Sequence, residues 1–145
     1  MAVSLKMRDT RVKPVRKRYW LTPPDLMAKL QAEFAFDFDA CPHPRPDGFD
    51  GLKVPWGKST WVNPPFTGIS WTEWARKCVV ECEAGKLVVV AIPCFAGRGI
   101  PLLCDAGAEW RMLGEVNWLA LEDGSAKDGR NRPMPTLLAI LRPGA

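Results

Sequence analysis

The sequence predicts a compact α/β domain over residues 19–145, with a mostly parallel central sheet and a C-terminal antiparallel strand. The segment over residues 86–93 is apolar without interruption after Lys86, which is typical of a central strand covered on both faces. Helical patterns before and after a short β-prone segment, residues 60–62, give the alternation of an α/β fold. The 145 residues are 47% hydrophobic and include seven Trp, which is enough for one folded core.

The first eighteen residues are strongly basic. Seven Lys and Arg against one Asp give them a charge of +6, which leaves −2 on the rest of a chain whose net charge is +4. We expect a flexible basic arm that contacts a polyanion, because phosphate contacts dominate sequence-independent nucleic-acid affinity. A solvated tail is the alternative. The candidate phosphate contacts are Arg11, Lys13, Arg16, Lys17 and Arg18.

The first helix is predicted over about residues 23–33. Thr22 can cap it with Pro23 at its first position, and apolar residues recur every four positions from Leu26. Alternating Phe and Asp over residues 34–39 then predict a half-buried strand that ends at Asp39-Ala40-Cys41. In α/β sheets ligands collect beyond the carboxyl ends of strands, so a ligand is expected beside this segment.

A second strand end carries the most restricted turn in the chain. The run over residues 60–62 stops at Asn63-Pro64-Pro65-Phe66, where two prolines hold the Asn63 amide and the Pro64 carbonyl in a narrow range of directions. Two oxygen acceptors beside an aromatic ring can grip the two hydrogens of a planar amine while the ring stacks on its base. Attack on a methylsulfonium then needs no prior general base, and positioning supplies much of the rate.

The loop between these strand ends contains Asp50, which can contact a ligand or act only as a turn residue. Beyond it, Ser70-x-x-Glu73 predicts the start of a helix that ends before Gly85. Cys78 and Cys82 on this helix are expected to be core thiols rather than metal ligands.

The C-terminal third is predicted to contain a short helix and several strands. The expected helix covers residues 101–106, and the expected strands cover residues 109–113, 115–121 and 135–141. The final strands suit an antiparallel pair at the sheet edge. The polar loop over residues 122–132 offers Arg130 and Arg132 as further phosphate contacts.

Five Cys without a CxxC pair predict reduced thiols, and no metal site is expected. No apolar run approaches membrane-spanning length and no signal core is present, so we expect a cytoplasmic protein with no membrane contact.

Asn63-Pro64-Pro65-Phe66 resembles the catalytic [Asp/Asn]-Pro-Pro-[Tyr/Phe] motif of amino-group methyltransferases that use S-adenosylmethionine. The order Thr-Pro, Asp-Ala, Asp-x-Leu, Asn-Pro-Pro-Phe looks most like the phage-type DNA N6-adenine methyltransferases. The resemblance covers roughly Trp20 to the C-terminus. It implies a Rossmann-like S-adenosylmethionine-dependent methyltransferase fold, encoded by a phage or its bacterial host, as a monomer or homodimer.

The resemblance also implies roles for individual residues. The target adenine would be flipped out of double-stranded DNA, held by Asn63 and the Pro64 carbonyl at the rigid turn that Pro65 completes, and stacked on Phe66. The residues implied to hold S-adenosylmethionine are Trp20, Thr22, Pro23, Asp39, Ala40, Cys41 and Asp50.

One segment departs from the family pattern: Pro42-His43-Pro44 stands where glycines are expected. This departure motivates one alternative, a non-catalytic nucleic-acid-binding protein that kept the fold. The other alternative is a methyltransferase that acts on RNA adenine or a protein amide, since the same tetrapeptide serves those substrates.

Overall fold

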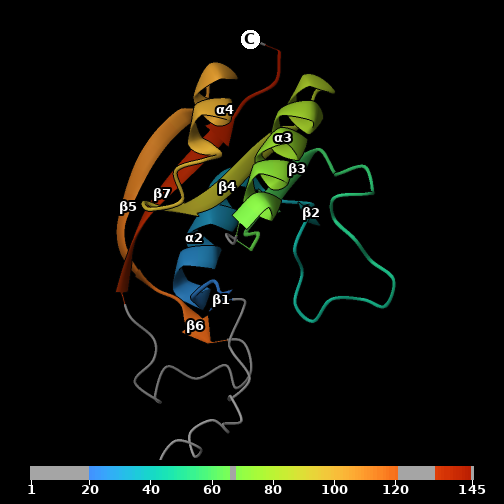
Figure 1. The fold of residues 1–145 in the computed structure, drawn as a ribbon. Coiled ribbons are helices and arrows are strands. Elements are labelled where there is room, and N and C mark those ends of the chain that lie inside the picture. The colour runs from blue at the N-terminus through green and yellow to red at the C-terminus, as the bar shows by residue number, and fades with distance from the viewer. Residues whose placement is uncertain (1–19, 66–67, 121–132, 145) are drawn as a thin grey trace, which may run out of the picture.

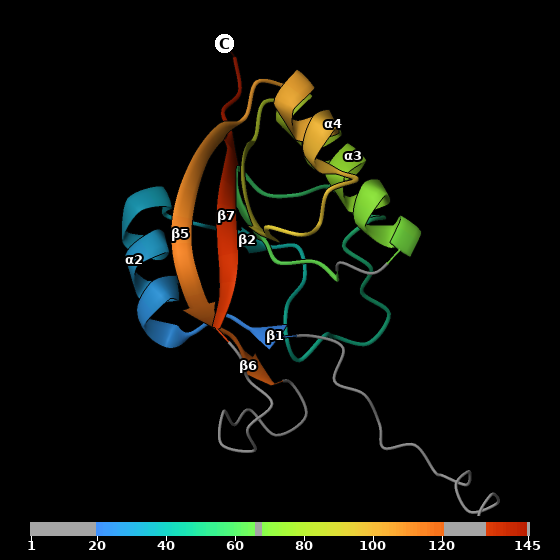
Figure 2. The same ribbon diagram turned by 60° about the vertical axis from the view of Figure 1, so that its left-hand side comes forward.

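The computed structural model describes residues 20–65, 68–120 and 133–144. Within these residues a five-stranded mixed sheet has the order β2-β3-β4-β7-β5, and a two-stranded sheet pairs β1 with β6. Helix α2 covers one face of the larger sheet, and α3 and α4 cover the other (Figures 1 and 2). The helices are α2 (Pro24–Phe34), α3 (Gly68–Glu83) and α4 (Ile100–Asp105). The strands are β1 (Trp20–Leu21), β2 (Phe38–Asp39), β3 (Ser59–Val62), β4 (Leu87–Pro93), β5 (Glu109–Asn117), β6 (Leu119–Ala120) and β7 (Pro133–Leu141).

The α/β class and the antiparallel strand near the C-terminal end are confirmed, but the prediction of a mostly parallel sheet is wrong. β2, β3 and β4 pair in parallel, whereas β7 pairs antiparallel with both β4 and β5. β7 lies inside the sheet because Leu138, Ala139, Ile140 and Leu141 are apolar on both faces and almost fully buried. A solvent-exposed edge strand would not tolerate that sequence.

β4 is the centre of the sheet, as its apolar run predicts. Its side chains alternate between two cores. Val88, Val90 and Ile92 face the core under α3 and α4. Val89 and Ala91 face the core under α2. Both sets are at most 1% exposed, so the strand is covered on both sides.

Two predicted helix starts are displaced. α2 begins at Pro24 with Pro23 as its N-cap and no side-chain cap, so Thr22 lies outside the helix. α3 begins at Gly68, two residues before the predicted Ser70 cap. The start of α2 is one residue later than predicted, because Pro23 has ψ 138°, outside the helical range, whereas α3 starts before its predicted cap.

Two strands also differ from prediction. The strand predicted from residue 34 is only Phe38–Asp39, because Phe34 completes α2 and Ala35 ends that helix in the left-handed conformation at φ 50°. The strand predicted at 109–113 and the first part of the strand predicted at 115–121 form the single β5, which passes an irregularity between Met112 and Gly114. Leu119 and Ala120, from the second of these predictions, form β6 in the small sheet instead. Gly114 has φ 78°, which a glycine adopts without steric cost.

Candidate functional site

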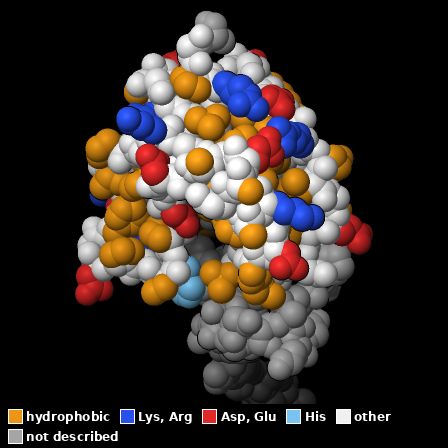
Figure 3. All heavy atoms as spheres, turned by 180° about the vertical axis from the view of Figure 1, so that it is seen from behind, with side chains coloured by type: hydrophobic (Ala, Val, Ile, Leu, Met, Phe, Trp, Pro, Cys, Tyr) orange, Lys and Arg blue, Asp and Glu red, His pale blue; other side chains and the backbone are white. Residues whose placement is uncertain are grey.

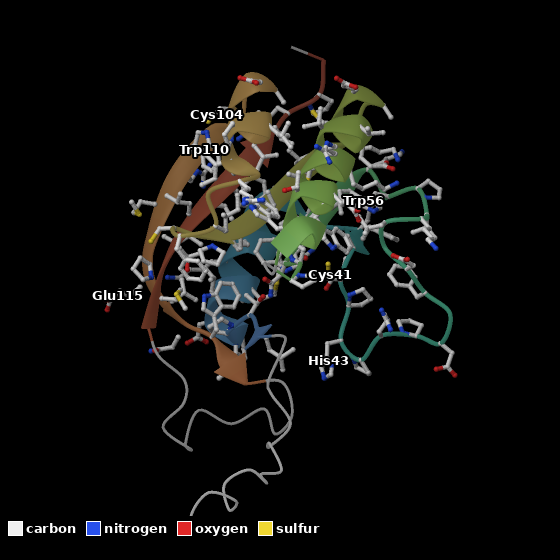
Figure 4. The ribbon with its side chains drawn as sticks, viewed as in Figure 1. Cys41, His43, Trp56, Cys104, Trp110 and Glu115 are labelled. Carbon is white, nitrogen blue, oxygen red and sulfur yellow. The ribbon has the colours of Figure 1, made fainter. Side chains whose placement is uncertain are left out.

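A pocket of about 640 Å³ opens at the carboxyl ends of β2 and β3. Figure 3 shows a hollow on this face with His43 at its rim, and Figure 4 shows Cys41 near the first turn of α3 and His43 further along the loop. The predicted site residues that line the pocket are Thr22, Asp39, Ala40, Cys41, Asp50, Asn63 and Pro65. They come from four separate segments, and the fold brings these segments to one cavity.

Strand pairing places the two predicted strand ends side by side. Asp39 is the register partner of Trp61, and the Ala40 N–H donates to the Trp61 carbonyl at 3.0 Å. The Asn63 backbone N–H in turn donates toward the Cys41 sulfur. Residues 39–41 and 61–63 therefore run next to each other out of the sheet and into the pocket.

The Asp39 carboxylate is held in a fixed direction at this edge. Its Oδ1 accepts the Cys41 N–H at 2.9 Å. Although the residue is exposed overall, protein atoms around the carboxylate displace water, and this desolvation raises its pKa above the ordinary value against the effect of the hydrogen bond. A ligand that brings positive charge or hydroxyl donors to Asp39 would relieve that cost.

Cys41 lines the same pocket but is not suited to act as a nucleophile. Burial, and then the nearby Asp39 charge, raise the pKa of its thiol far above the ordinary value. The thiol therefore stays protonated at neutral pH and serves as a small apolar wall.

The Asn63-Pro64-Pro65 turn presents two of its three residues to the pocket. Asn63 and Pro65 are half-buried and line it, whereas Pro64 is buried behind them. Phe66 lies outside the described residues. The turn thus places the polar Asn63 side chain, on a backbone restricted by proline, directly after the carboxyl end of β3.

Asp50 has one of the two roles that the sequence left open, that of a turn residue, and its position at the pocket allows the other. It lines the pocket, and its Oδ1 also accepts the Leu52 N–H at 2.9 Å, a local turn contact. Its side chain is 43% exposed and lies 3.9 Å from Lys53, a weak surface pair. One carboxylate oxygen is therefore committed to the turn.

Gly51 fixes how closely the 42–57 loop approaches the end of β2. A side-chain carbon at this position would overlap the Ala40 carbonyl oxygen and lie 2.8 Å from Cη2 of Trp74. Only glycine allows this approach. The Gly51 carbonyl also accepts the Trp56 indole N–H at 2.8 Å, so the same residue joins the pocket wall to the core.

Trp56 and Glu81 anchor the far end of that loop to α3. Trp56 stacks on Trp74 with ring centroids 6.3 Å apart, beside α3 in Figure 4. Glu81 is 7% exposed at its side chain, and it accepts from Lys77 at 2.7 Å and from Lys86 at 2.8 Å. Burial alone would raise the pKa of Glu81, but the hydrogen bonds from Lys77, Lys86 and the Trp56 N–H together lower it. The loop that forms the pocket wall is therefore held to α3 by a buried, ionised carboxylate.

Thr22 reaches the pocket through the small sheet rather than through a helix cap. β1 pairs antiparallel with β6, Leu21 opposite Leu119, and this pairing holds Leu21 and Thr22 at the pocket edge. Pro23 does not line the cavity. The Trp20 backbone belongs to β1, but its side chain lies outside the described residues.

Several predicted contacts lie outside the described residues. They are Arg11, Lys13, Arg16, Lys17, Arg18, Arg130 and Arg132. Sequence reasoning in turn missed part of the pocket lining. The missed residues are Leu21, Met27, Pro42, His43, Arg45, Phe49, Gly51, Leu52, Trp61 and Trp74. For His43 and Arg45 a signal was present, because they follow a strand end directly where glycines were expected.

Within the described residues, no group of three or more His, Cys, Asp or Glu could hold a metal ion. None of the described helices has the length and apolar character to cross a membrane. Neither a scan against protein-family models nor a search of curated proteins finds a match.

Proposed function

We propose that the protein is an S-adenosylmethionine-dependent methyltransferase that acts on a planar amine. The observation that carries this is the adjacency of residues 39–41 and Asn63 at one pocket. One strand end offers a carboxylate to a cationic, hydroxyl-bearing ligand, and its neighbour offers an amide oxygen to an amine. Methyl transfer requires the donor and the acceptor to be bound next to each other, and two adjacent strand ends allow this.

More specifically, we propose that the amine is N6 of adenine in DNA and that the fold is the Rossmann-like fold of phage-type methyltransferases. The ordered motifs support the family, and the basic residues over 1–18 support a polyanionic substrate. The parallel β2, β3 and β4, followed by an antiparallel β7, are compatible with that fold.

The described residues fit the cofactor. A pocket of about 640 Å³ is in the range of small-molecule sites, roughly 300–1,000 Å³. Its wall supplies two carboxylates, Asp39 and Asp50, for hydroxyl, ammonium or sulfonium groups, and the aromatic rings of Phe49, Trp61 and Trp74 for a base. When bound, the cofactor supplies an electrophilic methyl group.

The proposed role of Asn63 is to position the amine for attack. Its Oδ1 would accept one hydrogen of the adenine amine and help to turn the nitrogen lone pair toward the methyl carbon. The Pro64 carbonyl, which the resemblance implies as the second acceptor, belongs to a buried residue that does not line the pocket. With the donor bound, this orientation of the lone pair would let the nitrogen take the methyl group, which would leave the S–C electron pair on sulfur and one nitrogen proton to be released to water. Asn63 holds the proton-bearing nitrogen but does not take the proton, so no side chain has to titrate.

Asn63→Ala tests the proposal. Methyl transfer from radiolabelled cofactor to adenine-containing DNA should fall by at least about 10³-fold, since a positioning contact to the reacting atom is lost. Calorimetric affinity for S-adenosylmethionine should change less than about threefold, because Asn63 faces the amine. Normal turnover with lost cofactor affinity would contradict this assignment.

The same methyl-transfer assay with RNA and with protein, in parallel with DNA, distinguishes the alternative methyl acceptors. Pro42-His43-Pro44 in place of a glycine loop favours one further candidate, a nucleic-acid-binding protein without catalysis. Absence of cofactor binding at millimolar concentration, with DNA binding retained, would establish that candidate instead.

A further inference from the structure

Among the described residues that line the pocket, the acidic and basic side chains are two carboxylates and one guanidinium. Asp39 and Asp50 supply the negative charge. Arg45 supplies the positive charge, and no other Lys or Arg is among the described lining residues. Within the described part of the chain Arg45 forms no ion pair, although two carboxylates line the same cavity. Arg45 is an exposed residue at the pocket wall, and a guanidinium that makes no ion pair with the described residues can donate to an anionic group of a ligand.

The backbone next to Arg45 explains why a side chain is needed there. Loops after a β-strand commonly bind an anion through backbone N–H groups, which requires glycines. Here Pro42 and Pro44 have no N–H to donate, and both adjoin His43 at the pocket rim. This segment therefore lacks two of the donors that such a loop would provide.

We propose that Arg45 binds the carboxylate at the amino-acid end of S-adenosylmethionine, replacing the backbone donors that the prolines remove. The inference rests on the proposed function. A guanidinium fork can donate two parallel N–H bonds to a carboxylate, while Asp39 and Asp50 remain for the ammonium and hydroxyl groups. The ligand, with one carboxylate and two cationic centres, is complementary to a wall with one cation and two anions.

Calorimetry with three ligands tests the assignment. S-Adenosylmethionine and S-adenosylhomocysteine carry the carboxylate, whereas methylthioadenosine has the same adenosine and a thioether but no amino-acid end. Arg45→Gln should weaken the two carboxylate ligands about 10–100-fold, the range expected for hydrogen bonds to a charged group. Binding of methylthioadenosine should be unchanged. Arg45→Lys, which keeps the charge but not the fork, should lose less than Arg45→Gln.

Arg76→Gln is the matched control, because Arg76 is an exposed arginine on α3 that does not line the pocket. A thermal melt of each variant shows whether the fold is retained. If Arg45→Gln weakened the affinity for all three ligands equally, or for none of them, the role of Arg45 would be overturned. The proposed function would not be affected by either result. Failure of the unaltered protein to bind any of the three would instead refute the proposed function, and this inference with it.

Discussion

The backbone N–H of Trp56 donates to Glu81 Oε1 at 3.2 Å, although 25 residues separate them in the sequence. The same carboxylate accepts from Lys86, whose Nζ also donates to the Trp56 carbonyl at 2.6 Å. Both polar groups of the Trp56 backbone are thus tied to one buried ion cluster. The loop that carries Asp50 and Gly51 ends at this anchor.

Glu81→Ala should lower the free energy of unfolding by about 2–3 kcal/mol, because two half-buried ammonium groups and a backbone N–H lose their acceptor. Glu81→Gln should cost less, since Oε1 remains for Trp56. Glu73→Ala, an exposed change on the same helix, should be nearly neutral. Urea unfolding followed by Trp fluorescence measures all three, and an unchanged midpoint for Glu81→Ala would contradict the anchor.

The acid sensitivity of this anchor follows from the direction of the pKa shift. The folded state holds the pKa of Glu81 below its ordinary 4.5, so folding favours the ionised form. Its contribution to stability is present above pH 4.5 and is lost as the pH falls through the lower folded value. The difference in unfolding free energy between the unaltered protein and Glu81→Gln should therefore narrow as the pH falls from 4.5 through the folded-state pKa of Glu81.

Gly51→Ala should disturb the pocket more than its size suggests. The added carbon meets the Ala40 carbonyl and the Trp74 ring, so the loop must move away from the end of β2. We expect a loss of about 1–3 kcal/mol of stability and weaker ligand binding. Gly97→Ala is the matched control, since no heavy atom lies within 4 Å of its added carbon. Equal melting temperatures for the two variants would show that the close approach is unimportant.

Asp39→Asn should stabilise the folded protein at neutral pH. Desolvation raises the pKa of Asp39, so the folded state favours the protonated form, and that contribution is lost as the pH rises through the raised pKa. Asparagine removes the charge but keeps an oxygen for the Cys41 N–H. The advantage in melting temperature over unaltered protein should thus grow as the pH rises from 3 to 7. Asp47→Asn, an exposed change outside the pocket, is the control, and a pH-independent difference for Asp39→Asn would contradict the assignment.

Ala35→Gly should be a stabilising change. Ala35 ends α2 at φ 50°, where its side chain is strained and glycine is preferred. The relief exceeds the added entropy of the unfolded chain, so we expect a gain of about 0.5–1 kcal/mol. Ala32→Gly, an exposed change within the same helix, should have the opposite sign at a similar magnitude. Loss of stability in both variants would refute the strain at Ala35.

The features that depend on local chemistry were predictable from sequence. Prolines after Val62 and the polar residues after Phe38 mark strand ends, and parallel pairing then brings Asp39 and Asn63 together. The apolar run at 86–93 likewise identified the central strand.

The features that depend on distant contacts were not predictable. Nothing in the spacing links Glu81 to Trp56 or places Met27 in the pocket. The extent of β2 was also missed, because the helix propensity of residues 24–34 extends through a Phe that equally suits a strand. The mixed direction of the sheet required knowing where β7 inserts, which is decided by burial of the whole strand.

The position of β7 has a consequence for biosynthesis. This strand follows β5 in the chain yet separates it from β4, so β5 has no partner in the larger sheet until β7 arrives. The nascent polypeptide cannot assemble its central layer before the ribosome has translated past Leu141 and the exit tunnel has released that segment. Until then the backbone edges of β4 and β5 that pair with β7 remain open to chaperones, and a premature stop codon upstream of β7 would yield a chain that cannot complete the sheet.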